Sequence, residues 1–271
     1  MGPAENIFKS KYGRREIFSL GACLERSTFL ISGTGWSSDL EHNARAQARQ
    51  RGIPNVAVLD HWVNYRARFE RNGDVVLPDQ LWVADAEAKD LAEAIFPNLP
   101  VLQLPNHWLE ELTRAAGAER QVPQQKPARR LLYLLEPIRV PWPGGPDPQE
   151  PGELQGLRYW LKQLPTLAKQ GIIAPTQHLE ALSLRPHPSE PAGKYDALIG
   201  EAAQHWPLRL DASPSLASAL AWADAVFGCE TQALGAALAC GLPAFSTIPP
   251  WAPPCRLPQA ALHHLSRLEE P

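Results

Sequence analysis

Short apolar runs alternate with longer segments of helix-forming residues along most of this chain, and no other feature limits its fold as strongly. In the first half the expected strands are 27–33, 55–62, 77–85 and 101–105, and the expected helices are 38–52 and 86–96. Strands that alternate with helices build parallel sheets, because each helix returns the chain to the end of the sheet where the next strand begins. The pattern therefore predicts an α/β fold with parallel sheets.

A second series of the same kind follows a polar segment with two prolines at 117–130, which is typical of a linker. Its expected elements are strand 131–137, helix 153–171, strand 181–188, helix 194–206, strand 208–211, helix 213–223, strand 225–228, helix 231–241, strand 243–246 and a last helix over 259–270. The length of 271 residues suits two ordinary α/β domains. We therefore expect two Rossmann-like domains, 1–122 and 131–271, that face each other across a cleft.

The composition excludes several classes of protein. The net charge of −3 provides no general attraction for nucleic acid, so any anion site must be local. The sequence contains no uninterrupted apolar run of roughly 18 residues, the length that a membrane span needs. Its first residues also lack the apolar core of a signal peptide. We expect a cytoplasmic protein with no membrane span and no nucleic-acid partner.

A glycine-containing segment, SGTGWSSDLE, follows the first expected strand. Gly33 and Gly35 allow the backbone to turn closely, and Ser37 or Ser38 can cap a helix whose amides hold an anion. Asp60 ends the next strand, where a dinucleotide-binding fold carries the acid that holds a ribose. Two interpretations remain open at this point, a loop that faces a ligand and an ordinary capped turn.

A second segment, RPHP, forms the carboxyl end of the expected strand 181–188. Two prolines hold the backbone extended around His187 and so fix the direction of its imidazole. Arg185 adds a permanent charge and a fork of donors that suits phosphate. A metal is disfavoured, because no second His, Cys or Asp lies at ligand spacing. The sequence favours a phosphate contact over a purely structural turn.

A third loop joins the strand that ends at Gly228 to a helix that begins near Thr231. Small residues at the start of a helix let a ligand approach the free amides closely. Glu230, Thr231 and Gln232 are therefore candidate ligand contacts. The same small residues also suit a helix that packs tightly on a sheet, and the two interpretations are compatible.

Two of these segments resemble a known family. ALACGLPAF (237–245) resembles the end of the donor-binding helix of GT-B glycosyltransferases, and RPHPSE (185–190) resembles the His-Pro loop of bacterial sialyl-, Kdo- and CDP-glycerol transferases. The segment 29–62 is similar to the later N-domain strands of those enzymes and of UDP-N-acetylglucosamine 2-epimerases. The resemblance implies two Rossmann-like domains facing a cleft, with a shortened N-terminal domain.

The resemblance also implies a function, the transfer of a sugar from a CMP-, CDP- or UDP-linked donor to a surface-glycan acceptor. Arg185, His187 and Ser189 would contact the donor phosphate and nucleotide. The chain departs from the family at Ala236 and Gly228, where many members carry a Glu. The absence of a Glu at position 228 makes the inverting reaction the expected one.

An inverting transferase needs a base that deprotonates the acceptor hydroxyl. Asp39 and Glu41 at the start of the first helix are the leading candidates, and His61 beside Asp60 is the next. The sequence contains no Asp-x-Asp pair, so we expect a reaction without a bound metal or other cofactor. The alternatives are a non-catalytic relative that binds a nucleotide sugar, and an NAD-type enzyme that uses Gly33 and Gly35.

Overall fold

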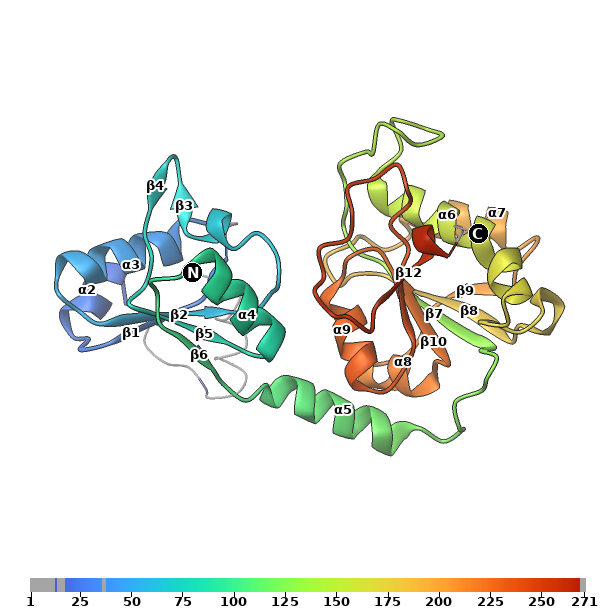
Figure 1. The fold of residues 1–271 in the computed structure, drawn as a ribbon, viewed down its shortest axis with the longest axis horizontal. Helices are drawn as coiled ribbons and strands as arrows, with labels where there is room; N and C mark the ends of the chain where they lie inside the picture. The colour runs from blue at the N-terminus through green and yellow to red at the C-terminus, as the bar shows by residue number, and fades with distance from the viewer. Residues whose placement is uncertain (1–12, 14–17, 36–37, 269–271) are drawn as a thin grey trace. The chain divides into compact units, whose positions relative to one another are not determined.

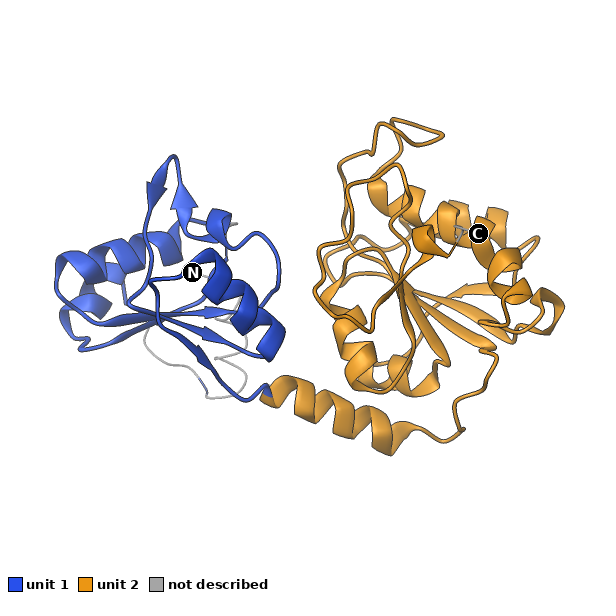
Figure 2. Cartoon of the chain, in the orientation of Figure 1, with its two compact units in different colours: residues 1–106 blue, residues 107–271 orange. Residues whose placement is uncertain are grey.

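A computed structural model describes residues 13, 18–35 and 38–268 of the chain. The chain forms two compact units, residues Met1–Asn106 (unit 1) and His107–Pro271 (unit 2), which Figure 2 colours separately. Each unit has its own parallel sheet, and no strand of the described residues pairs across the two. The prediction of an α/β fold with parallel sheets is confirmed. The cleft between the domains stays a prediction.

Unit 1 is built on a four-stranded sheet in which consecutive strands are neighbours, in the order β1-β2-β5-β6. Its main elements are β1 (Leu30–Ser32), α3 (Leu40–Gln50), β2 (Asn55–Leu59), β5 (Gln80–Val83), α4 (Ala86–Ile95) and β6 (Val101–Gln103). The two helices α3 and α4 cover the same face of the sheet (Figure 1). Leu59, Leu81 and Phe96 are buried in the core on that face. Every strand and helix expected in 27–105 is present.

Unit 1 also contains elements that the alternation pattern does not reveal. These are α2 (Leu20–Glu25), the 3-10 turn η1 (Arg66–Arg68) and a hairpin of β3 (Glu70–Arg71) and β4 (Asp74–Val75). The hairpin turns at Asn72 and Gly73, whose φ angles of 52° and 83° lie in the left-handed region. Asn-Gly is the preferred pair for such a two-residue turn, so the hairpin has a local cause in the sequence.

Unit 2 is a doubly wound sheet in the order β12-β11-β10-β7-β8-β9. Its elements are β7 (Arg130–Leu134), α6 (Gly152–Lys169), the 3-10 turn η2 (Thr176–His178), β8 (Ala181–Arg185), α7 (Asp196–Ala202), β9 (Leu208–Leu210), α8 (Leu216–Trp222), β10 (Ala225–Gly228), α9 (Gln232–Ala239) and β11 (Ala244–Ser246). Helices α6 and α7 cover one face, and α8 and α9 cover the other (Figure 1). From β7 the strand order runs outward in both directions, so the switch point of the sheet lies between β7 and β10.

The last segment of the chain differs from the prediction of a helix over 259–270. Residues His263–His264 form a short strand, β12, parallel to β11, and Leu265–Arg267 form the 3-10 turn η3. The ring of His263 stacks on Phe245 with centroids 5.0 Å apart. Pairing with the open edge of the sheet therefore outweighs the helical composition of this segment. The predicted residues 269 and 270 lie outside the described part.

Helix α5 (His107–Glu119) corrects the domain boundary, because it packs on α8 and α9 of unit 2. The sequence predicts that the residues of this helix belong to the N-terminal domain 1–122, whereas the division between the compact units falls between Asn106 and His107. Leu112 and Ala116 are the buried residues of the helix. At its end Arg120 donates to the carbonyl oxygens of Leu220 (2.8 Å) and Ala223 (3.2 Å).

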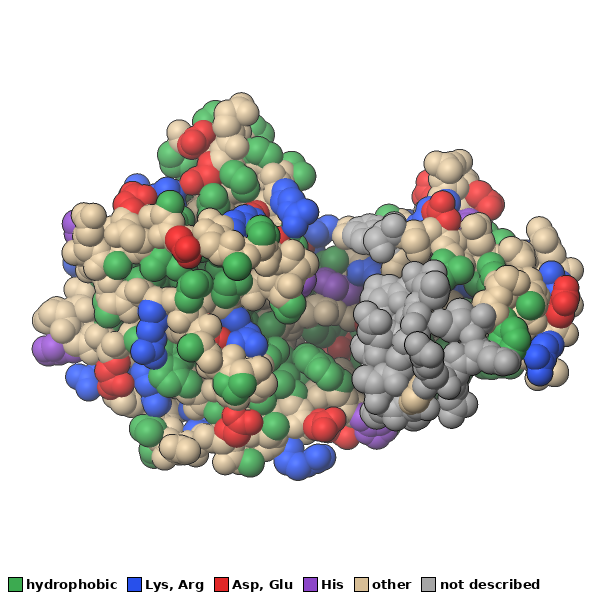
Figure 3. Space-filling model, turned by 180° about the vertical axis from the view of Figure 1, so that it is seen from behind, with side chains coloured by type: hydrophobic (Ala, Val, Ile, Leu, Met, Phe, Trp, Pro, Cys, Tyr) green, Lys and Arg blue, Asp and Glu red, His purple; other side chains and the backbone are tan. Residues whose placement is uncertain are grey.

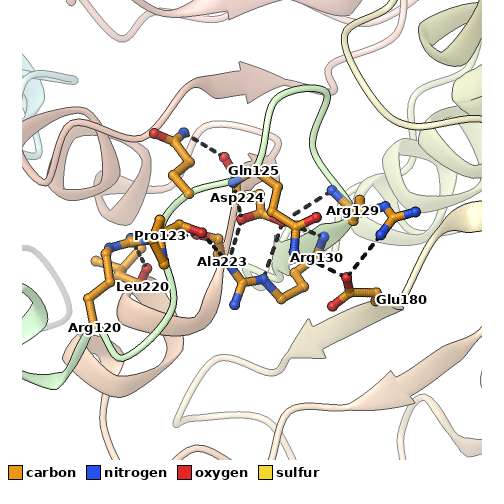
Figure 4. A network of polar contacts seen from close by, with 10 residues as sticks. Arg120, Pro123, Gln125, Arg129, Arg130, Glu180, Leu220, Ala223 and Asp224 are labelled. Carbon is orange, nitrogen blue, oxygen red and sulfur yellow. Dashed lines mark hydrogen bonds and ion pairs between the residues drawn. The ribbon is translucent and has the colours of Figure 1, made fainter.

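The linker between α5 and β7 is fixed to unit 2 by the buried carboxylate of Asp224 (Figure 4). This carboxylate accepts hydrogen bonds from the backbone N–H groups of Gln125 (2.9 Å), Arg129 (3.1 Å) and Arg130 (2.9 Å). It also accepts from Nε (3.2 Å) and Nη2 (2.6 Å) of Arg130. Asp224 precedes β10, at the end of the sheet opposite the switch-point loops, so the network has a structural role.

The surface shows no single dominant charge. On the face of unit 2 that Figure 3 presents, acidic and basic side chains are interspersed with hydrophobic ones. This distribution agrees with the small net charge of −3. None of the helices in the described residues is both long and apolar enough to cross a bilayer.

Candidate functional site

The carboxyl ends of the parallel strands are the places to search for a site, because open α/β sheets bind ligands outside these ends. In unit 1 the neighbouring strands β1 and β2 lead into the loops that carry the candidates Gly33, Gly35, Asp39, Glu41, Asp60 and His61. In unit 2 the ends of β8 and β10 lead into the loops that carry Arg185, His187, Ser189, Glu230, Thr231 and Gln232. The structure thus groups the candidates at the strand ends of their own units.

Glu41 lies against the glycine loop of unit 1. Its Oε2 accepts a hydrogen bond of 2.5 Å from the backbone N–H of Gly35. A Cβ atom on Gly33 would lie 2.5 Å from Oε1 of Glu41, and one on Gly35 would lie 3.1 Å from Oε2. The glycines therefore make room for a carboxylate of the protein itself. That negative charge disfavours a pyrophosphate in the same place, and with it the NAD-type interpretation.

Three arginines, Arg45, Arg68 and Arg71, donate hydrogen bonds to the backbone of this loop. Arg45 is fully buried and donates from Nη1 to Ser32 Oγ (3.2 Å) and to the carbonyl oxygen of Gly33 (3.0 Å). Burial lowers the pKa of Arg45 to about 10, against the opposing effect of the Glu41 charge. Arg68 donates to the carbonyl oxygen of Thr34, and burial also lowers its pKa. With a pKa of about 10, Arg45 stays charged at neutral pH.

The other acidic candidates of unit 1 are tied to the same cations. Asp39 pairs with Arg71 Nε at 3.2 Å, and Asp60 lies 3.8 Å from Arg68 Nη1. Asp39, rather than Ser38, is the residue that precedes the first turn of α3, and its side chain makes no capping hydrogen bond. The other predicted cap, Ser37, lies outside the described residues.

His61 is poorly arranged for the role of a base. The backbone N–H of Trp62 donates to its Nδ1 at 2.9 Å. In the neutral ring the proton therefore lies on Nε2, which then donates hydrogen bonds and cannot accept a proton. This geometry favours Glu41 and Asp39 over His61 as the group that deprotonates a hydroxyl.

The RPHP loop of unit 2 presents two donors at the end of β8. Ser189 donates from its backbone N–H to His187 Nδ1 (3.2 Å), and its Oγ lies 2.7 Å from the same atom. This leaves the proton of the neutral ring on Nε2 of an exposed imidazole. Arg185 uses Nη1 to pair with the buried Asp211 and to donate to the carbonyl oxygen of Ser213 (3.2 Å). Within the described residues its Nη2 and Nε remain available to a ligand.

The segment after the RPHP loop is braced against helix α6. Lys194 donates from Nζ to Glu153, in the first turn of α6, and to Glu190. Arg139 pairs with the second oxygen of Glu190 at 3.0 Å. Burial lowers the pKa of Lys194, but the two carboxylates outweigh it and hold the pKa above its usual value. These ion pairs fix the backbone that follows His187, so the loop is held in place rather than loose.

The switch point itself carries two glutamates. Glu136 follows β7, and its Oε1 accepts a hydrogen bond from the backbone N–H of Glu230 after β10. The Glu230 carboxylate accepts from the backbone N–H (2.6 Å) and Nε (2.9 Å) of Arg256. Thr231 caps α9, where its side chain accepts from the N–H of Ala233 at 3.4 Å. Burial raises the pKa of Glu136 to about 7.

Glu136 and Arg256 were missed in the sequence analysis. A signal existed for Glu136, because it is the one charged residue of the run LLYLLEP and lies near the end of the expected strand 131–137. Arg256 lies in a proline-rich segment without periodicity, where nothing in the sequence indicates its partner. Gln232 begins α9, as expected. Glu230 is already engaged within the protein. Its carboxylate accepts a hydrogen bond from Arg256, and its backbone N–H donates to Glu136.

A further hollow of unit 2 lies away from the strand ends. It is lined by Leu161, Lys162, Pro165, Thr176, Gln177, His205 and Trp206. These residues belong to α6 and to segments that precede β8 and β9, so the hollow lies toward the amino ends of the strands. Among the described residues, no three His, Cys, Asp or Glu side chains gather as a metal site would require.

Comparisons with known proteins do not assign a family. No protein-family model matches the chain, and no curated protein matches it. The structure is similar to that of Thermosulfurimonas dismutans KpsC, a beta Kdo 2,7 transferase, over 87% of this chain and 83% of that chain, at 11% sequence identity and a TM-score of 0.35.

Proposed function

We propose that the chain is a glycosyltransferase that binds a nucleotide-activated sugar at the switch point of unit 2 and transfers the sugar to a hydroxyl of a surface-glycan acceptor. The strand order of unit 2 is the observation that carries the proposal, because nucleotides bind outside the carboxyl ends of such sheets at the switch point. The resemblance of RPHPSE and ALACGLPAF to transferase segments favours this class over other nucleotide-binding proteins.

The donor would be held by groups that neutralise its phosphates. Nε2–H of His187 and the free N–H groups of Arg185 supply donors from the RPHP loop. The amino end of α9, at Thr231 and Gln232, supplies backbone amides and the positive end of the helix dipole. Donors fixed in this way stabilise the negative charge that develops on a leaving phosphate. We therefore propose a reaction that needs no bound metal.

The acceptor hydroxyl would be deprotonated by a carboxylate of unit 1. Glu41 is the first candidate, with Asp39 next. The N–H of Gly35 fixes the carboxylate of Glu41 beside the glycine loop, where the carboxylate can accept a proton. Direct displacement by the acceptor would invert the configuration of the sugar.

Nucleotide profiling by thermal shift separates this proposal from the alternatives. Stabilisation by CMP or CDP supports the transferase, and stabilisation by UDP supports the epimerase-like branch. Stabilisation by NAD would favour the dinucleotide enzyme, against the position of Glu41 beside the glycines. A chain that binds CMP or CDP but turns over no donor would be a non-catalytic relative.

His187→Ala is expected to weaken nucleotide binding about ten- to a hundredfold, because one hydrogen bond to a charged phosphate contributes roughly 1.5–3 kcal/mol. Titration calorimetry with CMP and CDP measures the change. The control is His205→Ala, which removes an exposed imidazole in the hollow toward the amino ends of the strands. Equal affinity of the His187 variant and the wild type would show that the imidazole does not contact the nucleotide and that the loop is only a structural turn.

Glu41→Gln is expected to lower turnover of a labelled donor by roughly 10²–10⁴-fold, the usual contribution of a general base. The amide oxygen of the new side chain can still accept from the N–H of Gly35, so the loop keeps its shape. Asp39→Asn tests the second candidate, and Glu87→Gln, an exposed acid of α4, is the control.

The same assays are run with EDTA, and the wild type is expected to keep its rate. Full activity of both the Glu41 and Asp39 variants would remove these acids from the mechanism. Complete loss of activity with EDTA would overturn the metal-free reaction.

A further inference from the structure

The backbone just before the amino end of α9, at the switch point, already holds a carboxyl group of the protein. The carboxylate of Glu136 accepts a hydrogen bond from the backbone N–H of Glu230, one residue before the cap Thr231. The contact joins two strand ends that are 94 residues apart in the sequence. The carboxyl group of Glu136 thus lies next to the amides of Thr231 and Gln232, where the proposed function places the anionic group of the ligand.

The charges around Glu136 leave it without a cation of its own. Of the two neighbouring carboxylates, Glu230 pairs with Arg256 and Glu153 pairs with Lys194. In the part of the chain that the structure describes, Glu136 forms no ion pair. Among its electrostatic neighbours, the Glu230 and Glu153 charges favour the neutral form of Glu136, and the Arg256 charge favours the ionised form.

The Tyr133 phenol, whose pKa burial raises well above its usual value, and two thiols are further titratable groups that interact with this carboxylate. Burial raises the pKa of Cys229 to about 12 and also raises that of Cys255, so both are neutral near pH 7. Burial of Glu136 raises its own pKa to about 7, which brings its titration into the neutral range. A second anion beside it would favour the protonated form further.

We propose that the Glu136 carboxylate, held on the backbone N–H of Glu230 beside the amino end of α9, opposes the binding of the anionic group of the nucleotide there, so that nucleotide binding is coupled to the uptake of one proton by Glu136. This inference rests on the proposed function of unit 2. The protonated carboxyl no longer repels the phosphate and can donate a hydrogen bond to it. Glu136 then acts as a gate that makes the donor site more accessible as the pH falls.

Titration calorimetry tests the coupling with CMP and CDP as probes. Titrations at pH 8 in buffers of different ionisation enthalpy give the number of protons taken up on binding. The wild type is expected to take up nearly one proton, and its affinity is expected to fall by up to tenfold per pH unit between pH 7.5 and 9. The phosphates of the probes have their last pKa near 6, so they contribute little in this range.

Glu136→Gln is expected to bind without proton uptake and with an affinity that is nearly independent of pH in this range. Glu111→Gln removes an exposed carboxyl of α5 and is expected to behave as the wild type does. The thermal unfolding of each variant is recorded first to confirm that it is folded.

The outcomes separate the inference from the proposed function. Nucleotide binding with the same proton uptake in wild type and Glu136→Gln, or with none in the wild type, would overturn the gate and leave the function standing. Binding by Glu136→Gln but not by the wild type would support the gate. No binding of CMP or CDP by either chain would reject both.

Discussion

Asp224→Ala is expected to destabilise unit 2 by about 3–5 kcal/mol, the usual effect of removing one partner of a buried ion pair. The wild-type carboxylate is 0% exposed and satisfies five N–H groups, three of the backbone and two of Arg130. Without it, the buried guanidinium of Arg130 loses its carboxylate and keeps only its bond to the Pro123 carbonyl oxygen, and the linker loses the contacts that fix it to the sheet. Urea unfolding followed by tryptophan fluorescence measures the change.

The double variant Asp224→Ala/Arg130→Met is the control for this prediction. Replacing Arg130 as well removes the unpaired buried charge, so part of the stability is expected to return, whereas the three backbone N–H groups still lack their acceptor. A single Asp224 variant within about 1 kcal/mol of the wild type would contradict the role of the network.

The ion pair also predicts a loss of stability in acid. Burial raises the pKa of Asp224, but the Arg130 guanidinium and the three backbone N–H groups outweigh it and hold the pKa below its usual value. A carboxyl whose pKa is lowered on folding stabilises the protein above the pKa of the unfolded chain, near 4. This contribution is lost as the pH falls below that value.

Much of the fold could be predicted from the sequence, because buried parallel strands are short apolar runs with helices between them. β7 and β10 are fully buried, and the mostly apolar sequences RLLYL and AVFG predict this burial. Local patterns could not assign α5 to its unit. Its amphipathic face indicates that it packs on something, but the bonds of Arg120 to Leu220 and Ala223 reveal the partner only in three dimensions.

The site could be predicted only in part. Strand ends can be recognised in the sequence. Arg185 is the last residue of β8, and His187 and Thr231 follow strands β8 and β10. The contact between Glu136 and Glu230 depends on the pairing of β7 with β10, two strands that are not consecutive in the chain. The sequence orders the strands along the chain and leaves their order in the sheet open. The partners of individual side chains therefore stay hidden until the topology is known.

The second large effect is expected in the pH dependence of stability, and it arises from Glu136. Its pKa in the folded protein is about 7, whereas a free Glu has a pKa near 4.3. The folded chain then binds more protons than the unfolded chain between these values, so the free energy of unfolding falls as the pH rises from about 4.5 to 7. The loss amounts to at most about 4 kcal/mol, since one pKa unit corresponds to 1.36 kcal/mol.

Glu136→Gln is expected to lack this loss, because its side chain stays neutral. Urea unfolding of both chains at pH 5 and pH 8 gives the difference in stability at each pH. That difference is expected to shift in favour of the variant by about 2–3 kcal/mol at pH 8, while Glu111→Gln shifts by less than about 0.5 kcal/mol. If wild type and Glu136→Gln differ by the same amount at both pH values, Glu136 titrates as an ordinary surface acid. The proton uptake proposed for nucleotide binding would then lose its physical basis, even with the hydrogen bond to Glu230 in place.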